Sequence, residues 1–152
     1  MKVVVFGASV FAELVWYALT NDSEHQVVGF TVDGNYLRNT IMQNLPVVPF
    51  EEVEASFPPE EVACIIPMSW HGINGVRARK HCLAKEKGYR LISYLSSRAT
   101  IGCDFLHGEN CLVFDGTVIE PFSKIGDGVI ISSGCTVSHH VTIGDHCFLS
   151  PG

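Results

Sequence analysis

Short apolar runs alternate with longer amphipathic stretches through the first half of the chain. The apolar runs are typical of buried strands and lie at 2–6, 26–31, 62–66 and 90–95, and a short LPVV segment at 45–48 leads into the second helix. Between them, the apolar spacing predicts helices that begin after Ser9 and near Glu51, and a longer helix over 75–87. Strands that alternate with helices at this spacing predict a parallel α/β sheet covered by helices on both faces.

Aliphatic residues recur every six positions in the second half of the chain. The series is Ile101, His107, Val113, Ile119, Ile125, Ile131, Val137, Ile143 and Leu149, of which all but His107 are aliphatic, and four positions after each member a small residue is frequent. A sustained period of six is typical of hexapeptide solenoids, in which three faces make one coil and residues 18 apart stack. The pattern therefore predicts a left-handed parallel β-helix with Ile101, Ile119 and Val137 in one column.

The change from the alternating pattern to the period of six falls near Ser96. We therefore expect an α/β Rossmann-like N-terminal domain over 1–96 and a β-helix domain over 97–152. Few coils are written before Gly152, and a solenoid that stops within a repeat leaves an unpaired edge and an open core. We accordingly expect a truncated, incomplete β-helix.

Ligands of a parallel α/β sheet bind beyond the carboxyl ends of its strands, which draws attention to three loops, 7–11, 32–35 and 67–72. The first loop consists of Gly7, Ala8, Ser9, Val10 and Phe11. It opens a helix, whose unpaired N–H groups suit a phosphate. It is not the dinucleotide fingerprint, because Val10 stands where the second glycine would be.

Two residues of these loops have structural as well as binding interpretations. Gly7 either contacts a ligand or only permits the turn after the first strand. Asp33 either accepts hydrogen bonds from a ribose or a base, or is a turn aspartate. The basic residues of the helix over 75–87 are predicted to form its solvated face rather than to bind phosphate. They are Arg77, Arg79, Lys80, Lys85 and Lys87.

Composition limits the partners and the compartment. The chain is 47% hydrophobic and 17% charged, with a net charge of -6, so it folds and is predicted to bind neither nucleic acid nor an anionic membrane surface. Glu13 interrupts the first apolar stretch, and no run is long enough to span a bilayer, so we expect a cytoplasmic protein. The six cysteines form no C-x-x-C pair and are expected to be reduced and mostly buried.

His139 and His140 follow Val137 at a position predicted to face outward at a turn. An imidazole takes up a proton near neutral pH, as a general base in acyl transfer must. The alternative is a pair of solvated turn histidines. A metal site that also includes His146 is not predicted, because adjacent side chains splay apart on an extended chain.

Three segments together resemble a known family: GASVFAE near the start, LISYLSSRATIG before the hexapeptides, and SHHVTIGDHCFLSPG at the end. With them the whole chain resembles the nucleotide-sugar N-acetyltransferases of the bacillosamine and perosamine type, to which sialic-acid O-acetyltransferases are similar. The resemblance implies a homotrimer, an N-terminal domain that binds the nucleotide-linked amino sugar, and acetyl-CoA bound between neighbouring β-helices.

The resemblance also assigns roles to individual residues. His139 corresponds to the catalytic base, and His140 stands where the family often has a Glu or Asp that raises the basicity of that base. Glu120 lies one coil below Ser138 and is an alternative helper by the 18-residue register. Phe148 occupies a position where related enzymes place a histidine against acetyl-CoA.

In the first domain, the resemblance assigns substrate binding to Ser9, Val10 and Phe11, and nucleotide contact to Asp33. The implied function is acetyl transfer from acetyl-CoA to a nucleotide-linked amino sugar, for surface-glycan biosynthesis. O-acetylation of a sugar is one alternative, since it requires the same base. A non-catalytic sugar-nucleotide-binding or trimerisation module is the other, and it would require only the fold.

Overall fold

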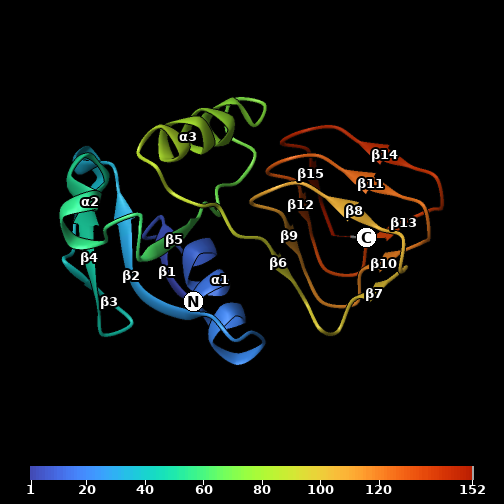
Figure 1. Ribbon diagram of the computed structural model, residues 1–152, viewed down its shortest axis with the longest axis horizontal. Helices are drawn as coiled ribbons and strands as arrows, with labels where there is room; N and C mark the ends of the chain where they lie inside the picture. The colour runs from blue at the N-terminus through green and yellow to red at the C-terminus, as the bar shows by residue number, and fades with distance from the viewer. Residues whose placement is uncertain (152) are drawn as a thin grey trace. The chain divides into compact units, whose positions relative to one another are not determined.

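The computed structural model describes residues 1–151, and within them the chain forms two compact units (Figure 1). One unit comprises Met1–Met68 with Arg79–Leu91. The other comprises Ser69–Ala78 and the chain from Ile92 onward. These limits differ from the division expected near Ser96, which remains a prediction about the functional domains.

The first unit contains a five-stranded sheet in the order β3-β4-β2-β1-β5. Four of its strands run parallel to one another: β1 (Lys2–Phe6), β2 (Gln26–Val32), β4 (Leu45–Pro49) and β5 (Val62–Ile65). The fifth, β3 (Ile41–Met42), is antiparallel to β4, so the sheet is mixed and not wholly parallel as predicted. The reason is a two-residue hairpin turn, in which Gln43 and Asn44 both have positive φ angles, of 51° and 59°.

The predicted helices of the first half are present. They are α1 (Val10–Asn21), α2 (Val53–Ser56) with the preceding 3-10 turn η2 (Phe50–Glu52), and α3 (Gly75–Glu86); a further 3-10 turn, η1 (Gly34–Tyr36), follows β2. The core of the first unit includes Val4, Phe6, Val53 and Ile66, all less than 5% exposed. None of the helices within residues 1–151 combines the length and the apolar character that a bilayer span requires.

One predicted strand is wrong. The apolar run at 90–95 was expected to extend the first sheet, but only Leu91 makes a single parallel bridge there, to Cys64. The end of the run is β6 (Tyr94–Leu95), which pairs with β9 (Leu112–Val113) in the second unit. An apolar pattern reports burial but not the partner strand, and this run is divided between two partners.

The second unit is a parallel β-helix of two-residue strands (Figure 1). Besides β6 and β9, its strands are, in chain order, β7 (Thr100–Ile101), β8 (Leu106–His107), β10 (Val118–Ile119), β11 (Lys124–Ile125), β12 (Ile130–Ile131), β13 (Thr136–Val137), β14 (Thr142–Ile143) and β15 (Phe148–Leu149). They form three parallel sheets, β7-β10-β13, β8-β11-β14 and β6-β9-β12-β15. The predicted column of Ile101, Ile119 and Val137 is confirmed by the pairing of these residues.

Left-handed residues stand at corners of the β-helix. The non-glycine residues with positive φ include Asn110, Phe122, His140 and His146, and the glycines include Gly116, Gly128 and Gly134. Several of them are 18 positions apart, as Phe122 and His140 are. The chain therefore repeats its turns as well as its strands, and His140 occupies one such turn.

Small inward residues connect successive coils through their side chains. The hydroxyls of Thr117 and Ser123 donate to the carbonyls of Ser132 and Ser138, at 3.2 and 2.9 Å. The thiols of Cys111 and Cys135 likewise donate to carbonyls 15 residues further along the chain, those of Gly126 and Ser150, both at 3.1 Å. Since all four donors are less than 5% exposed, a larger side chain at this position would lose the bond and lack room.

All six cysteines are free thiols. Burial is less general than predicted: Cys64, Cys111 and Cys135 are buried and Cys147 is half-buried, but Cys82 and Cys103 are exposed. Burial raises the pKa of Cys64 to about 12, so this thiol does not serve as a nucleophile near neutral pH.

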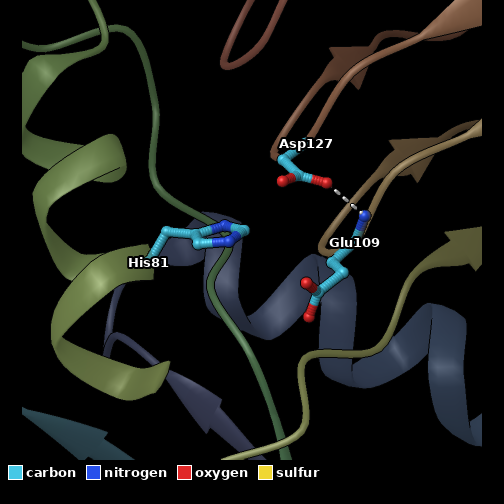
Figure 2. Close-up of side chains that lie close together, drawn as sticks. All are labelled: His81, Glu109 and Asp127. Atoms are coloured by element: carbon cyan, nitrogen blue, oxygen red, sulfur yellow. Dashed lines mark hydrogen bonds between the residues drawn. The ribbon is translucent and has the colours of Figure 1, made fainter. Parts of the chain in front are cut away.

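The Gly-Asp pairs of the repeats form a ladder between coils. The Asp127 carboxylate accepts a hydrogen bond from the backbone N–H of Glu109 at 2.8 Å (Figure 2). The Asp145 carboxylate likewise accepts one from the N–H of Asp127 at 2.9 Å. A Cβ at Gly126 would collide with the Asp145 carboxylate and lie 2.8 Å from the Asp145 backbone nitrogen. The glycine of this motif therefore makes room for the carboxylate of the coil above, a structural role.

We expect Gly126→Ala to lower the free energy of unfolding by about 1–3 kcal/mol, because the added methyl displaces Asp145 from its backbone donor. Urea denaturation of this 152-residue chain measures the change. Gly144→Ala is the matched control, because within the described residues a Cβ there meets nothing within 4 Å. Equal destabilisation by both variants would contradict the proposed ladder.

Candidate functional site

The loop between β1 and α1 holds the first group of predicted site residues. Gly7 has a φ of 116°, which favours glycine, and its N–H donates to the carbonyl of Thr31 in β2 at 2.7 Å. Ser9 is the N-cap of α1, and its hydroxyl accepts a hydrogen bond from the N–H of Ala12 at 3.5 Å. Gly7 and Ser9 thus have structural roles, and their contact with a ligand remains a prediction.

The remaining residues of this loop are accessible. Ala8 and Val10 are exposed, Val10 by 83%, and Phe11 is half-buried. Because β1 and β2 are parallel neighbours, the loop lies at the same sheet edge as the segment that follows β2. The structure therefore brings the two predicted binding segments of the first unit, 7–11 and Asp33, to one edge.

Asp33 is engaged in an ion pair with Lys80 of α3. The Lys80 ammonium also lies 4.8 Å from the ring centroid of Phe50 and 5.3 Å from that of Phe6, within the range of cation–π attraction. The result is a carboxylate and an ammonium group held together at the carboxyl end of the sheet. Asp33 is also the residue that begins η1, where its carbonyl accepts a hydrogen bond from the N–H of Tyr36 at 2.8 Å, so it has the structural role of a turn residue, and its contact with a nucleotide remains a prediction.

Glu51 fixes the segment that follows Asp33. Its carboxylate accepts a hydrogen bond from the backbone N–H of Gly34 at 3.0 Å. A hydrogen bond from its own backbone N–H, together with this one from Gly34, lowers the pKa of Glu51. The start of η1 is therefore tied to the element that follows β4.

The predicted solvated face of α3 is only partly correct. Arg79 and Lys85 are exposed, as expected. Lys80 is half-buried on Asp33, and Lys87 is half-buried on Glu54, with a nitrogen–oxygen distance of 2.8 Å that accompanies a lowered pKa of Glu54. These two lysines have specific anionic partners, which the helical pattern does not reveal.

Arg77 departs furthest from that prediction, since it is fully buried. Its Nε donates to the carbonyl of Gly128 at 3.1 Å, and Nη1 to the carbonyl of Ser69 at 3.2 Å. Nη2 donates to the carbonyls of His146 and Cys147. Burial lowers the pKa of Arg77, and four carbonyl groups solvate the guanidinium in place of water.

His139 and His140 lie exposed at a corner between β13 and β14. Their Nδ1 atoms are 3.0 Å apart, so one ring donates a hydrogen bond to the other. The expectation that the two side chains splay apart is therefore wrong. His140 has a φ of 59°, and this left-handed residue interrupts the extended chain on which the expectation rested.

Residues of the preceding coil support the pair. Glu120 accepts a hydrogen bond from the backbone N–H of His139 at 2.7 Å, so this carboxylate contacts the main chain of His139. The Phe122 ring lies 4.8 Å from the His140 ring, centroid to centroid. The His139 ring is therefore contacted by His140. Glu120 holds the main chain of His139, and Phe122 packs against the His140 ring.

Phe148 lies in β15, which belongs to a different sheet from β13 and from β14. Its ring packs against Trp70, with centroids 5.2 Å apart and planes at 63°. The two rings line a pocket of about 730 Å³ together with His71, Gly72, Ile73, Asn74 and Ser150. The structure therefore does not bring Phe148 into the histidine corner, and its contact with acetyl-CoA remains a prediction.

Residues 106–139 match the family of bacterial transferase hexapeptide (six repeats). This segment, with its parallel two-residue strands, makes the second unit a hexapeptide-repeat β-helix. No curated protein matches the chain.

Solved structures share the fold over nearly all of the chain. The acetyltransferase domain of PglB from Neisseria gonorrhoeae FA1090, in complex with acetyl coenzyme A, matches with a TM-score of 0.81 and 22% identity over 99% of this chain and 71% of that one. PerB from Caulobacter crescentus, in complex with CoA and GDP-perosamine, matches with 0.83 and 22% over 99% and 69%. WeeI from Acinetobacter baumannii AYE matches with 0.81 and 25% over 100% and 71%. The resemblance drawn from the sequence is thus confirmed at the level of fold.

Three groups escaped the sequence interpretation. Phe122 lies 18 residues before His140, so the register could have revealed it. Trp70 lies in the loop 67–72 that the sheet topology indicated, but nothing in the pattern pairs it with Phe148. The hydrogen bonds of Arg77 to Gly128, His146 and Cys147 join residues 51 to 70 positions apart, and local spacing carries no such information.

We expect Arg77→Ala to lower the free energy of unfolding by at least about 2 kcal/mol, because buried carbonyl groups lose a charged donor. Arg77→Lys restores little, since an ammonium lacks the planar fork that reaches several carbonyls. Urea denaturation measures both variants. Arg79→Ala is the control, because Arg79 is an exposed arginine two residues further along α3. Its free energy of unfolding should stay within about 0.5 kcal/mol of that of the unmodified chain. Equal stability of Arg77→Ala and Arg79→Ala would refute the structural role of Arg77.

Proposed function

We propose that this chain transfers the acetyl group of acetyl-CoA to the amino group of a nucleotide-linked amino sugar, for surface-glycan biosynthesis. The observation that carries the proposal is the exposed His139, whose Nδ1 meets His140 and whose backbone N–H binds Glu120. The fold supports it, because the PglB domain and PerB share it and were solved with acetyl coenzyme A and with CoA and GDP-perosamine.

His139 acts as the general base in this proposal. Its Nδ1 is paired with His140, which leaves Nε2 to meet the amine. Neutral Nε2 takes a proton from the amino nitrogen as that nitrogen forms a bond to the thioester carbonyl carbon. The carbon–sulfur bond breaks, and His139 returns the proton to the departing sulfur, which gives the N-acetyl sugar and CoA.

His140 positions the base. A ring-to-ring hydrogen bond through Nδ1 fixes the orientation of His139, as a carboxylate does for the base in the family that the chain resembles. Phe122 is 54% exposed beside His140 and offers an apolar surface on which the pantetheine arm of acetyl-CoA would pack. The residues around His139 therefore fit this co-substrate.

The nucleotide is assigned to the first unit. In the proposal, Gly7, Ala8, Ser9, Val10 and Phe11 form the loop that receives it, and the start of α1 offers N–H groups to its phosphates. Asp33, oriented by Lys80, accepts hydrogen bonds from the ribose or the base. A cytoplasmic location and a homotrimer with acetyl-CoA between its β-helices complete the proposal.

Replacing His139 with Ala is expected to lower kcat by about 10²–10⁴-fold, because the amine loses its proton acceptor. The measurement is CoA release from acetyl-CoA in the presence of UDP-, dTDP- and GDP-linked amino sugars, with the product identified by mass spectrometry. His107→Gln is the control, since His107 is also an exposed histidine of the β-helix.

Undiminished turnover by the His139→Ala protein would remove the base from the mechanism. Absence of acetyl transfer by the unmodified protein to every sugar would favour a binding or assembly module. An acetyl group that mild alkali releases from the product would indicate an ester, and hence O-acetylation.

The His140→Glu and His140→Ala variants test the positioning role through kcat. The Nδ1 atom of His140 lies 3.0 Å from that of His139, and a carboxylate at position 140 can accept the same hydrogen bond. We therefore expect His140→Glu to retain most of kcat, whereas His140→Ala, which offers no acceptor, lowers kcat by at least about tenfold. Equal values of kcat for His140→Ala and the unmodified protein would contradict the role of His140.

A further inference from the structure

The two ring nitrogens that meet at the corner of His139 and His140 have the separation of two ligands of one metal ion. Their Nδ1 atoms are 3.0 Å apart. A metal–nitrogen bond is about 2.0–2.1 Å long, so two nitrogens bound to one ion at angles of about 90–110° lie about 2.8–3.4 Å apart. We propose that the two histidines chelate a transition-metal ion that prefers nitrogen, and that the bound ion prevents His139 from acting as a base. The site rests on this geometry, whereas its effect on catalysis rests on the proposed function.

The orientation of the two rings suits ligands in neighbouring positions of one ion. The ring planes are at 88° and the centroids are 5.2 Å apart, so the imidazoles do not collide when both face the same ion. In the hydrogen bond each Nδ1 points at the other, and rotation of each ring about its Cβ–Cγ bond directs both lone pairs to a shared ion. Both side chains are exposed, so they are free to rotate and an ion can reach them from solution.

The surroundings of the two rings favour a cation but do not fill its coordination sphere. The Glu120 carboxylate lies 2.7 Å from the backbone nitrogen of His139 and adds a negative charge beside the site. Among residues 1–151, no third His, Cys, Asp or Glu side chain lies close enough to both rings to bind the same ion. The site therefore differs from the group of three that includes His146, and its remaining coordination positions are open to water.

The donor set selects the kind of metal. Neutral imidazoles suit Zn²⁺, Ni²⁺ and Cu²⁺, whereas Mg²⁺ and Ca²⁺ prefer oxygen ligands. Cu²⁺ binds nitrogen most tightly of these ions, but it also oxidises thiols, and Cys82 and Cys103 are exposed. Ni²⁺ is therefore the probe for binding and inhibition.

A metal ion at this site removes the basic nitrogen of His139. A neutral imidazole has one nitrogen with a free lone pair and one that carries a hydrogen. In the proposed mechanism the hydrogen is on Nδ1 and the lone pair on Nε2 takes the proton of the amine. A metal ion bound to Nδ1 uses the lone pair of that nitrogen, so the hydrogen of the neutral ring moves to Nε2. Nε2 then cannot accept a proton, and acetyl transfer is inhibited.

Isothermal titration calorimetry with Ni²⁺ alone tests the site. We expect His139→Ala and His140→Asn each to weaken the binding of one Ni²⁺ at least about tenfold, because one of two nitrogen ligands is lost. Asparagine is chosen at position 140 because it readily adopts the left-handed backbone of His140. His107→Gln is the matched control, since it removes another exposed histidine of the β-helix and should leave this affinity unchanged.

Nitrogen NMR of the imidazole rings supplies a structural readout. Zn²⁺, which is diamagnetic, should shift the Nδ1 signals of His139 and His140 together. The Nε2 signal of His139 should then take the value of a nitrogen that carries a hydrogen. A Zn²⁺-induced shift at only one of the two rings, or at Nε2 in place of Nδ1, would overturn the shared site.

Inhibition is measured by mass spectrometry of the acetylated product, because Ni²⁺ also binds the thiol of released CoA. The amide oxygen of His140→Asn can accept the hydrogen bond from Nδ1 of His139, so this variant should keep measurable turnover. We expect its half-inhibitory concentration of Ni²⁺ to be at least about tenfold higher than that of the unmodified protein. Removal of Ni²⁺ with EDTA should restore the activity of the unmodified protein.

The outcomes separate this inference from the proposed function. If the unmodified protein acetylates no sugar nucleotide, the proposed function fails, and calorimetry and NMR still decide whether the two histidines bind a metal ion. Equal Ni²⁺ affinity of the unmodified protein, His139→Ala and His140→Asn overturns the site. Binding of Ni²⁺ by both rings without loss of turnover overturns the inhibition.

Discussion

The backbone hydrogen bonds between successive coils are the interaction on which the second unit depends. Each short strand donates to the coil that follows it, as Thr100 does to Thr117 at 2.8 Å and Val118 does to Cys135 at 2.8 Å. Two-residue strands have almost no stability alone, so the ladder is effective only when every coil keeps the same register. One constraint therefore fixes side chains that lie far apart along the chain. Glu120 reaches the N–H of His139, and Phe122 lies against His140, because a coil of 18 residues separates the two turns.

The register also explains why the repeats have the composition they do. Inward positions alternate between aliphatic side chains, which fill the column, and small donors such as Ser123, which bond to a carbonyl of the next coil. Gly126 leaves room for the carboxylate of Asp145, which caps a backbone N–H. A motif that resembles part of an active site in sequence is thus largely a device for stacking coils. The chemistry is left to the residues that depart from the repeat, and His139 and His140 are such residues.

The structural features that follow from a repeating sequence pattern could be predicted, whereas contacts between residues outside any repeat could not. The columns of the β-helix follow from counting in sixes, and the helices and most strands of the first unit follow from local apolar spacing. The antiparallel β3 could not be predicted in this way, since its direction depends on a turn formed by Gln43 and Asn44, which lack the usual glycine. Arg77 looked like one more cation on a solvated helix. Its burial is decided by carbonyl groups of distant coils, which no local window contains.

The histidine pair of the candidate site was also only partly predictable from the repeat. Position in the repeat predicted that His139 and His140 would be exposed at a turn, and they are. The left-handed backbone of His140 determines whether their rings meet, and this conformation is unusual enough outside glycine and asparagine that the residue type gave no indication of it. A carboxylate next to a base carries a fixed negative charge, which favours the protonated imidazole at all pH values above its own titration. A second imidazole carries no such charge. It orients the base through one hydrogen bond between the two Nδ1 atoms, which lie 3.0 Å apart.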